Sequence, residues 1–254
     1  MVEPGAMTNR NARMLVLWLR TAIVVAILSG WEALARSGLL FRDVVPSLLD
    51  IGRALILLLA DPAYYFHLAW TVMEIGAALA LGALSGLAAG LLLGANRFLG
   101  RAFIPYIHYL GSTPKLVFFP VMILFFGVGP ASKIALGVIS CFFPVALSIA
   151  AGVRQMDRVL VRVGRSFRAN PHHMIAKIYV PAMRLPIVNG LRLGLGITIV
   201  ATLLAETKLS NHGVGHLIIQ AFTMFDMPQM YALLITTFAL AIGANVLLTR
   251  LARA

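Results

Sequence analysis

The chain has 254 residues, of which 60% are hydrophobic and only 12% charged, and its mean hydropathy is +0.91. A soluble domain of this length carries about a quarter charged residues, so this composition excludes an ordinary soluble enzyme. The apolar residues come in runs of about 20, enough to cross a bilayer core roughly 30 Å thick, whereas the alternating segments of about 10 residues typical of a membrane barrel are absent.

The formal net charge is +12, a value that in a soluble protein would suggest nucleic-acid binding. The positive-inside rule explains it without a nucleic-acid partner, because Lys and Arg concentrate in particular loops. The single cysteine, Cys141, lies in an apolar run, which excludes an internal disulfide framework and favours a small buried packing residue. These features predict an all-α, polytopic membrane protein.

Six apolar runs predict about six transmembrane helices in one domain, residues 14–254, after an N-terminal tail of residues 1–13. The predicted spans are residues 14–35, 68–94, 103–127, 134–153, 187–205 and 231–251. The first run has features of a signal peptide, because Arg10 and Arg13 precede it and Ala33-Leu34-Ala35 resembles a cleavage site. We expect it to be retained as a membrane span.

The basic residues predict the orientation in the membrane. One set of loops holds Arg10, Arg13, Arg97, Arg101, Arg154, Arg158, Arg162, Arg165, Arg168, Lys177, Arg184, Arg250 and Arg253, and the opposite set holds only Arg36, Arg42, Arg53, Lys133 and Lys208. We therefore expect both termini and the 154–186 segment to face the cytoplasm. In the opposite 36–67 loop, the stretch from Pro46-Ser47 to Asp61-Pro62 predicts a short helix at the outer interface.

Small residues form a stripe along the second span. Gly82, Gly86, Gly90 and Gly94 recur every four residues, and such a stripe lets a neighbouring helix backbone approach closely. Gly190 and Gly194 repeat the pattern in the fifth span. We interpret these residues as helix-packing positions without a chemical role. We find no convincing repeat and no inverted pair of broken helices, which argues against a secondary transporter.

A few charged residues lie within the predicted spans. Lys115 follows Thr113-Pro114, an expected helix break, and Glu206 ends the fifth span, while Glu32 and Glu74 lie in the first and second. Each is explained either by snorkelling or an internal ion pair, or by a place beside a translocation path. The aromatic residues that suit an apolar gate, or simply interhelical packing, are Phe118, Phe119, Phe142 and Phe143.

The 165–181 segment, RSFRANPHHMIAKIYVP, interrupts the apolar runs. Asn170 suits an N-cap and Pro171 the first helical position, and Pro181 and Pro186 are expected to end the helix. Its apolar stripe is Met174, Ile175, Ile178 and Tyr179. Such a helix either docks in a groove on a partner or rests on the inner leaflet, and the residues alone favour neither.

Enzyme chemistry has little support in the sequence. There is no G-x-x-x-x-G-K-[ST] phosphate loop, and no nucleophile paired with a base. The adjacent His172 and His173 point about 100° apart on a helix, a poor arrangement for chelating one metal. Gly213 and Gly215 favour a loop around His212 and His216. We expect no metal site and no cofactor in this chain.

From about Val45 to Leu251 the chain resembles permease subunits of ABC importers for nitrate, sulfonate and taurine. The stretches that carry the resemblance are VPS at 45–47, STPKLVFFPVMILFFGVG at 112–129, SKIALGVISCFFPVALSIAAGVRQMD at 132–157, VPAMRLPIVNGLRLGLG at 180–196 and GVG at 213–215. Together they follow the family order over most of the chain. The resemblance implies a type I importer permease fold with a cytoplasmic coupling helix in the 154–186 loop.

In that family the coupling loop starts with Glu-Ala-Ala, has a Gly six residues after the Glu, and ends in Ile-x-Leu-Pro. Here Ile178 and Pro181 occupy the end positions, while Arg162 and Arg168 replace the Glu and the Gly. The residues that the resemblance assigns to ATPase coupling are Arg162, Gly164, Arg168, Asn170, Pro171, His172, His173, Met174, Ile175, Ile178, Tyr179 and Pro181.

The resemblance further implies a translocation pathway for a small solute in the bacterial inner membrane, with Lys115, Phe118, Phe142, Phe143 and Glu206 as its candidate residues. The implied partners are two ATPase subunits that bind ATP and Mg²⁺, a second copy or a homologous permease, and a periplasmic or lipid-anchored substrate-binding protein. The competing hypotheses are a secondary carrier or channel without ATP coupling, and a membrane-embedded enzyme.

Overall fold

The computed structural model describes residues 9–38, 44–167 and 170–251, where every regular element is helical. The elements are α1 Asn9–Arg36, α2 Leu48–Ala60, α3 Pro62–Ala95, α4 Arg97–Ser112, the 3₁₀ helix η1 Lys115–Phe118, α5 Phe119–Phe126, α6 Pro130–Gln155, α7 Arg158–Ser166, α8 Pro171–Met174, the π-helix η2 Ile175–Tyr179, α9 Val180–Ala182, α10 Arg184–Lys208, α11 Val214–Thr223 and α12 Met227–Leu251. Within these described ranges, five helices are long and apolar enough to cross a membrane, and the number rises to six if the bent pair α4 and η1–α5 is one span. The all-α, polytopic prediction is confirmed.

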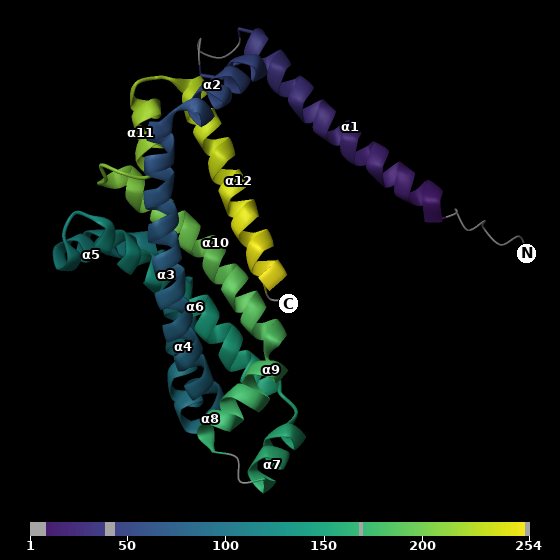
Figure 1. Cartoon of the computed structure of the whole chain (residues 1–254), viewed down its shortest axis with the longest axis vertical. Coiled ribbons are helices and arrows are strands. Elements are labelled where there is room, and N and C mark those ends of the chain that lie inside the picture. The colour runs from purple at the N-terminus through teal and green to yellow at the C-terminus, as the bar shows by residue number, and fades with distance from the viewer. Residues whose placement is uncertain (1–8, 39–43, 168–169, 252–254) are drawn as a thin grey trace, which may run out of the picture.

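The third predicted span, residues 103–127, is not one straight helix. α4 ends at Ser112, and the segment from Lys115 to Phe126 leaves it at 89°, so that α5 projects sideways from the bundle (Figure 1). The cause is Pro114, which lacks an N–H and holds the preceding Thr113 in an extended conformation with φ −70° and ψ 141°. A helix break was expected at this place, but the prediction that residues 103–127 form one continuous span was wrong.

The core lies where α3, α6 and α10 pack together. Gly82, Gly86, Gly90 and Gly94 of α3 all face α6, against Cys141, Val145, Ile149 and Val153 respectively. A Cβ added to Gly90 would lie 2.6 Å from the Cβ of Ile149 and 2.7 Å from the Ala146 carbonyl oxygen. The predicted stripe is therefore a line of close backbone approach, and Cys141 is a fully buried packing residue.

The helix ends follow from their capping residues. The Ser47 hydroxyl accepts a hydrogen bond from Asp50 N at the start of α2, and the Asp61 carboxylate accepts one from Ala63 N at the start of α3. The short helix predicted in the 36–67 loop is thus present. Figure 1 places α2 and α11 at one end of the molecule and α7 and α8 at the other.

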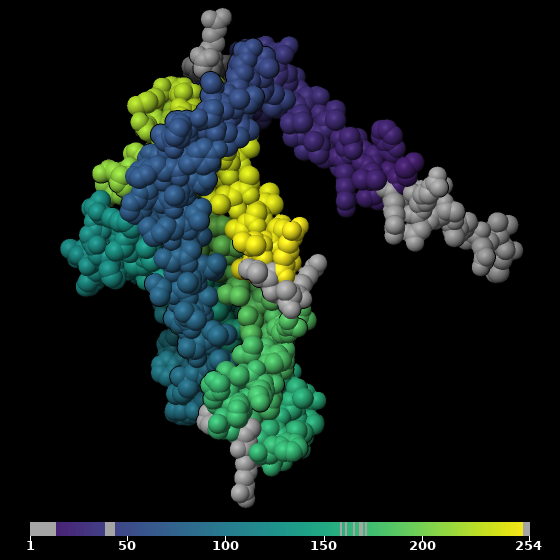
Figure 2. Space-filling view, viewed as in Figure 1, coloured from purple at the N-terminus to yellow at the C-terminus, as the bar shows by residue number. Residues whose placement is uncertain are grey.

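α1 stands apart from the other helices. It leaves the top of α2 and runs away from the bundle (Figure 2), and none of its most apolar window is buried. Its surface is therefore available to lipid or to another subunit. The helix begins at Asn9, inside the predicted 1–13 tail, and residues 1–8 lie outside the described residues.

Substituting alanine at two glycines of α3 tests the close approach. Gly90→Ala is expected to destabilise the protein by roughly 1–3 kcal/mol, because its methyl group meets both a side chain and a backbone carbonyl of α6. Gly76→Ala is the matched control on the same helix, since an added Cβ there meets nothing within 4 Å. Thermal unfolding in detergent measures both, and equal midpoints would contradict the packing.

Candidate functional site

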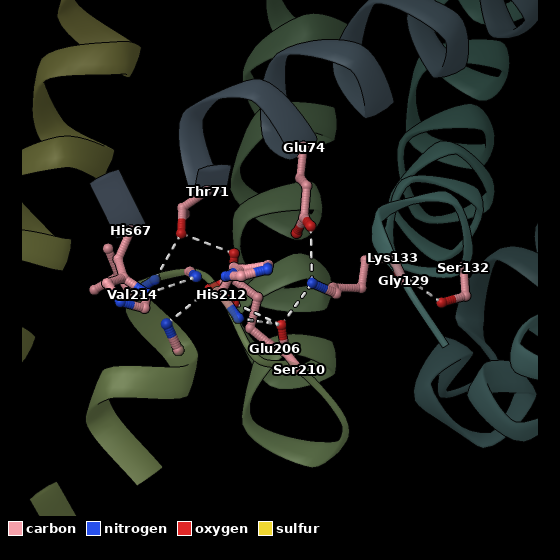
Figure 3. Close-up of polar contacts among 12 residues, drawn as sticks. His67, Thr71, Glu74, Gly129, Ser132, Lys133, Glu206, Ser210, His212 and Val214 are labelled. Atoms are coloured by element: carbon pink, nitrogen blue, oxygen red, sulfur yellow. Dashed lines mark hydrogen bonds and ion pairs between the residues drawn. The ribbon is translucent and has the colours of Figure 1, made fainter. Parts of the chain in front are cut away.

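A buried ion pair joins α3 to α6 (Figure 3). Glu74 Oε1 lies 2.8 Å from Lys133 Nζ, and the two side chains are 0% and 3% exposed. Lys133 also donates to the Ser210 hydroxyl at 2.7 Å, which ties in the loop after α10. The prediction that Lys133 is an outer loop charge was wrong, because α6 begins at Pro130 and its first turn turns the lysine inward. Of the two explanations considered for Glu74, the structure contains the internal ion pair.

Glu206, in the last turn of α10, belongs to a second part of the same network. Its Oε1 accepts a hydrogen bond from the Thr71 hydroxyl at 2.7 Å, and its Oε2 accepts one from Gly215 N at 2.7 Å. The side chain is completely buried. Glu206 therefore does not line an open path in this structure, contrary to its place among the pathway candidates, because hydrogen bonds within the chain satisfy both oxygens.

The start of α11 explains the GVG sequence at 213–215. Three successive N–H groups donate to side chains: Gly213 to His67 Nδ1 at 3.2 Å, Val214 to Thr71 Oγ1 at 2.8 Å, and Gly215 to Glu206. These are the groups that a helix start leaves without partners, and a carboxylate beside them is favoured by the helix dipole. Gly213 has φ +102°, and a Cβ on Gly213 or Gly215 would overlap Glu206.

Aromatic rings cover the network on one side. The rings of His67 and His216 stack at 5.9 Å between centroids, and those of Trp70 and His212 at 5.2 Å. His212 lies in a loop as expected, but His216 lies in the first turns of α11. Among the described residues no group of three or more His, Cys, Asp or Glu has the geometry of a metal site.

The remaining pathway candidates lie near the bend in the third span. Lys115 Nζ donates to the Gly111 carbonyl at the end of α4, and it lies 5.4 Å from the centre of the Phe143 ring. Phe142 and Phe143 contact each other edge to face at 5.2 Å, and Phe118 is partly exposed. The structure thus brings Lys115 and Phe143 together, at a place distinct from the buried Glu206.

The segment predicted to couple the chain to a partner begins as expected. His173 N donates to Asn170 Oδ1 at 2.8 Å, the N-cap bond, and α8 starts at Pro171. However, Pro181 and Pro186 do not end helices. Pro181 lies inside α9 and Pro186 inside α10, and the break falls at Met183. The preceding π turn, Ile175–Tyr179, changes the bonding register just where Pro181 cannot donate.

The apolar stripe of this segment is used mostly within the chain. Met174 is buried, and a Cβ on Gly164 of α7 would overlap Met174 and Ile178. Tyr179 packs on the core cluster formed by Cys141, Val145, Ile149, Val153 and Met183. The prediction that the whole stripe faces a partner was wrong, since α7 and α6 already cover most of it.

What remains on the outside is a small surface. Ile175 is 43% exposed, and His172, His173, Lys177 and Arg162 are also exposed. Arg168 lies outside the described residues, so nothing structural follows for the predicted Gly position. The spacing of the sequence pattern located this surface, but only packing reveals which of its residues are free.

Apolar helices long enough to span a membrane, packed around a glycine-lined core, define a polytopic helical membrane protein. The profile of the family described as binding-protein-dependent transport system inner membrane component matches residues 81–254, more than half of the chain. The chain therefore belongs to this family, whose members are the membrane-spanning components of ABC importers.

Individual relatives agree with the family. The chain is 30% identical over 211 residues to a Bacillus subtilis protein named as an aliphatic sulfonates transport permease, SsuC, with 83% of this chain and 75% of that protein covered. It is 30% identical over 195 residues to the taurine transport system permease protein TauC of Escherichia coli, with 75% and 71% covered. A Haemophilus influenzae protein named as an ABC transporter permease is 26% identical over 220 residues, with 87% and 89% covered.

A double-mutant cycle tests the buried pair. Lys133→Met leaves the Glu74 carboxylate buried without its cation and is expected to cost about 3–5 kcal/mol, and Glu74→Met is expected to be similarly harmful. Glu74 Oε2 is already buried without a hydrogen-bond partner in the described part of the chain. The double variant is therefore expected to recover most of the loss, as measured by unfolding in detergent. Additive single losses would contradict a direct pair.

Proposed function

We propose that this chain forms the translocation path for a small solute in an ATP-driven importer, and that the 170–181 segment couples it to a separate ATPase subunit. The observation that carries the proposal is that this segment is anchored in the core on one side and exposed on the other. Its outer surface, with Ile175 and the two exposed histidines, is available, while Met174 and Tyr179 anchor it inside the chain.

This packing suits a segment that transmits movement to the membrane helices. Tyr179 packs on the core cluster that Met183 forms with Cys141, Val145, Ile149 and Val153 of α6. Gly152 of α6 meets Pro186 so closely that an added Cβ would lie 2.6 Å away. Packed interiors transmit displacement because they have little free volume. Closure of an ATPase dimer would therefore move the segment together with α6 and α10, and rock the spans between inward-facing and outward-facing states.

The partners follow from the same proposal. Two ATPase subunits bind ATP and Mg²⁺, which fits the lack of a phosphate loop in this chain. A second copy or a homologous permease completes the membrane part, and a periplasmic or lipid-anchored binding protein delivers the solute. Arg162 is exposed and occupies the position where the family's coupling loop has a glutamate. In this proposal it pairs with a carboxylate on the ATPase subunit.

Relatives named for aliphatic sulfonates and taurine support a small sulfonate-like solute. Lys115, Phe118, Phe142 and Phe143 are its proposed pathway residues, near the bend of the third span. In the bacterial inner membrane, the end of the molecule with α7 and α8 faces the cytoplasm together with both termini, in keeping with its arginine-rich loop.

Introducing a charge at one exposed apolar residue tests the coupling. In the importer assembled with its cognate ATPase and binding protein, Ile175→Asp is expected to lower solute-stimulated ATP hydrolysis by about tenfold or more, because a central apolar contact is lost at the interface. Ile175→Val is the matched control and keeps activity. Tyr179 is unsuitable for this test, since it packs on the core.

The outcome is decided by two readouts. Unchanged ATPase stimulation and unchanged co-purification of the ATPase with Ile175→Asp would contradict the proposal, provided that the variant unfolds at the parent temperature. A secondary carrier predicts solute movement by the permease without any ATPase, and an enzyme predicts turnover by the purified chain alone.

A further inference from the structure

α4 exposes two surfaces of opposite character. Its packed side, formed by Gly100, Ile104, Ile107 and Gly111, lies against the rest of the bundle. In the first turn of α4 the exposed residues are Arg97 and Phe98, and Phe98 is an apolar side chain on the same side as Pro105 and Tyr109. From Arg101 onward, the exposed residues outside the packed side divide into a polar sector, Arg101, His108, Tyr109 and Ser112, together with Pro105, and an apolar sector, Phe103 and Leu110, with Tyr106 between them. Exposure alone does not separate them, since Tyr109 is 73% and Leu110 52% exposed.

The spacing makes the polar sector a continuous stripe. Arg101, Pro105, His108 and Ser112 follow one another at intervals of four, three and four residues. At about 100° per residue these four positions fall within an arc of roughly 60°, and Leu110 lies about 160° from Ser112. One side of α4 is thus suited to acyl chains and another is not.

A polar stripe facing lipid is costly, and polar groups in membrane helices almost always face protein or a water-filled cavity. Pro105 adds to this cost, because it cannot donate a hydrogen bond to the Arg101 carbonyl one turn earlier. A carbonyl freed in this way needs another partner, such as water or a neighbouring polar side chain. The polar stripe therefore favours contact with water on one side of α4.

Lys115 continues the stripe beyond the bend. Its ammonium group donates to the Gly111 carbonyl, next to Ser112, and is only partly buried. The same chain pairs its other intramembrane lysine, Lys133, with Glu74, but Lys115 forms no ion pair with any carboxylate in the described residues. At the end of the polar sector, a positive charge is thus left without a carboxylate partner among the described residues.

We propose that the polar sector of α4 lines the water-filled translocation path, and that Lys115 at its end makes this path favour anions over cations. The inference rests on the proposed transport function for the identity of the path. α4 is 16 residues and thus about 24 Å long, so Arg101 near its start and Lys115 after its end meet a small anion in succession.

Cysteine labelling of the full chain in native membranes tests this without knowledge of the solute. Cys141 is the only cysteine and is fully buried, so the parent protein gives the background. Ser112→Cys places a thiol of similar size in the polar sector, and Leu110→Cys is the matched control in the apolar sector. Each is treated, in right-side-out and everted vesicles, with an anionic sulfonatoethyl and a cationic trimethylammonioethyl methanethiosulfonate.

The thiol of Ser112→Cys is expected to react with both water-soluble reagents in at least one vesicle orientation, and that of Leu110→Cys with neither. Adding Lys115→Met to Ser112→Cys is expected to lower the ratio of anionic to cationic reaction rates by about tenfold, from one unit charge at roughly 6 Å in water. Lys115→Arg should restore the ratio.

Three results would overturn the proposal. Equal labelling at both cysteines, or none at Ser112→Cys, would mean that the polar sector does not face a water-filled path. A rate ratio unaffected by Lys115→Met would mean that the path does not favour anions. Neither readout requires ATP hydrolysis, so both stay informative if coupling to an ATPase fails its own test.

Discussion

The close contact between α3 and α6 determines where the other parts of this protein lie. Four glycines of α3 allow α6 to approach so closely that an added Cβ at each position would lie under 3.0 Å from the Cβ of a residue of α6. In a membrane, where burial of apolar surface adds little, such contact is a main source of helix association. It also aligns Glu74 on α3 with Lys133 on α6, and so sets the position of the buried network.

That network and the 170–181 segment, for which we propose a coupling role, lie toward opposite ends of the same packed core. At one end, Glu206 receives the start of α11 through the Gly215 N–H, and Thr71 bonds both. Toward the other end, Tyr179 packs on the cluster that contains Cys141 and Met183. In the proposed function, a displacement of the 170–181 segment would therefore be passed directly to α6 and α10, whereas α1 and α5 project from the bundle (Figure 1).

The periodic features of the fold followed from the sequence. The apolar runs located the spans, the four-residue glycine repeat located the packing face, and Asn170-Pro171 located a helix start. These succeed because they depend on local geometry. Other features depend on which residues meet across the fold, and spacing along the sequence does not encode such contacts. These features are the inward orientation of Lys133, the burial of Glu206 and the packing of Met174 within the chain.

The polar sector of α4 was missed for a related reason. Arg101, His108 and Ser112 have helical spacing in the sequence, but the neighbouring apolar residues conceal the stripe until the packed side is known. Gly164 is a further example. The family pattern marks its position, but the packing of Met174 and Ile178 against it supplies the reason for a small residue.

The most direct test of the account is a cross-link from the exposed surface of the coupling segment. Ile175→Cys, labelled with benzophenone maleimide in the assembled importer, should form an adduct with the ATPase subunit on illumination, and Cys141 should remain unlabelled because it is buried. An adduct with the ATPase is the predicted result. Adducts with lipid alone would contradict the account, because the segment would then rest on the membrane surface.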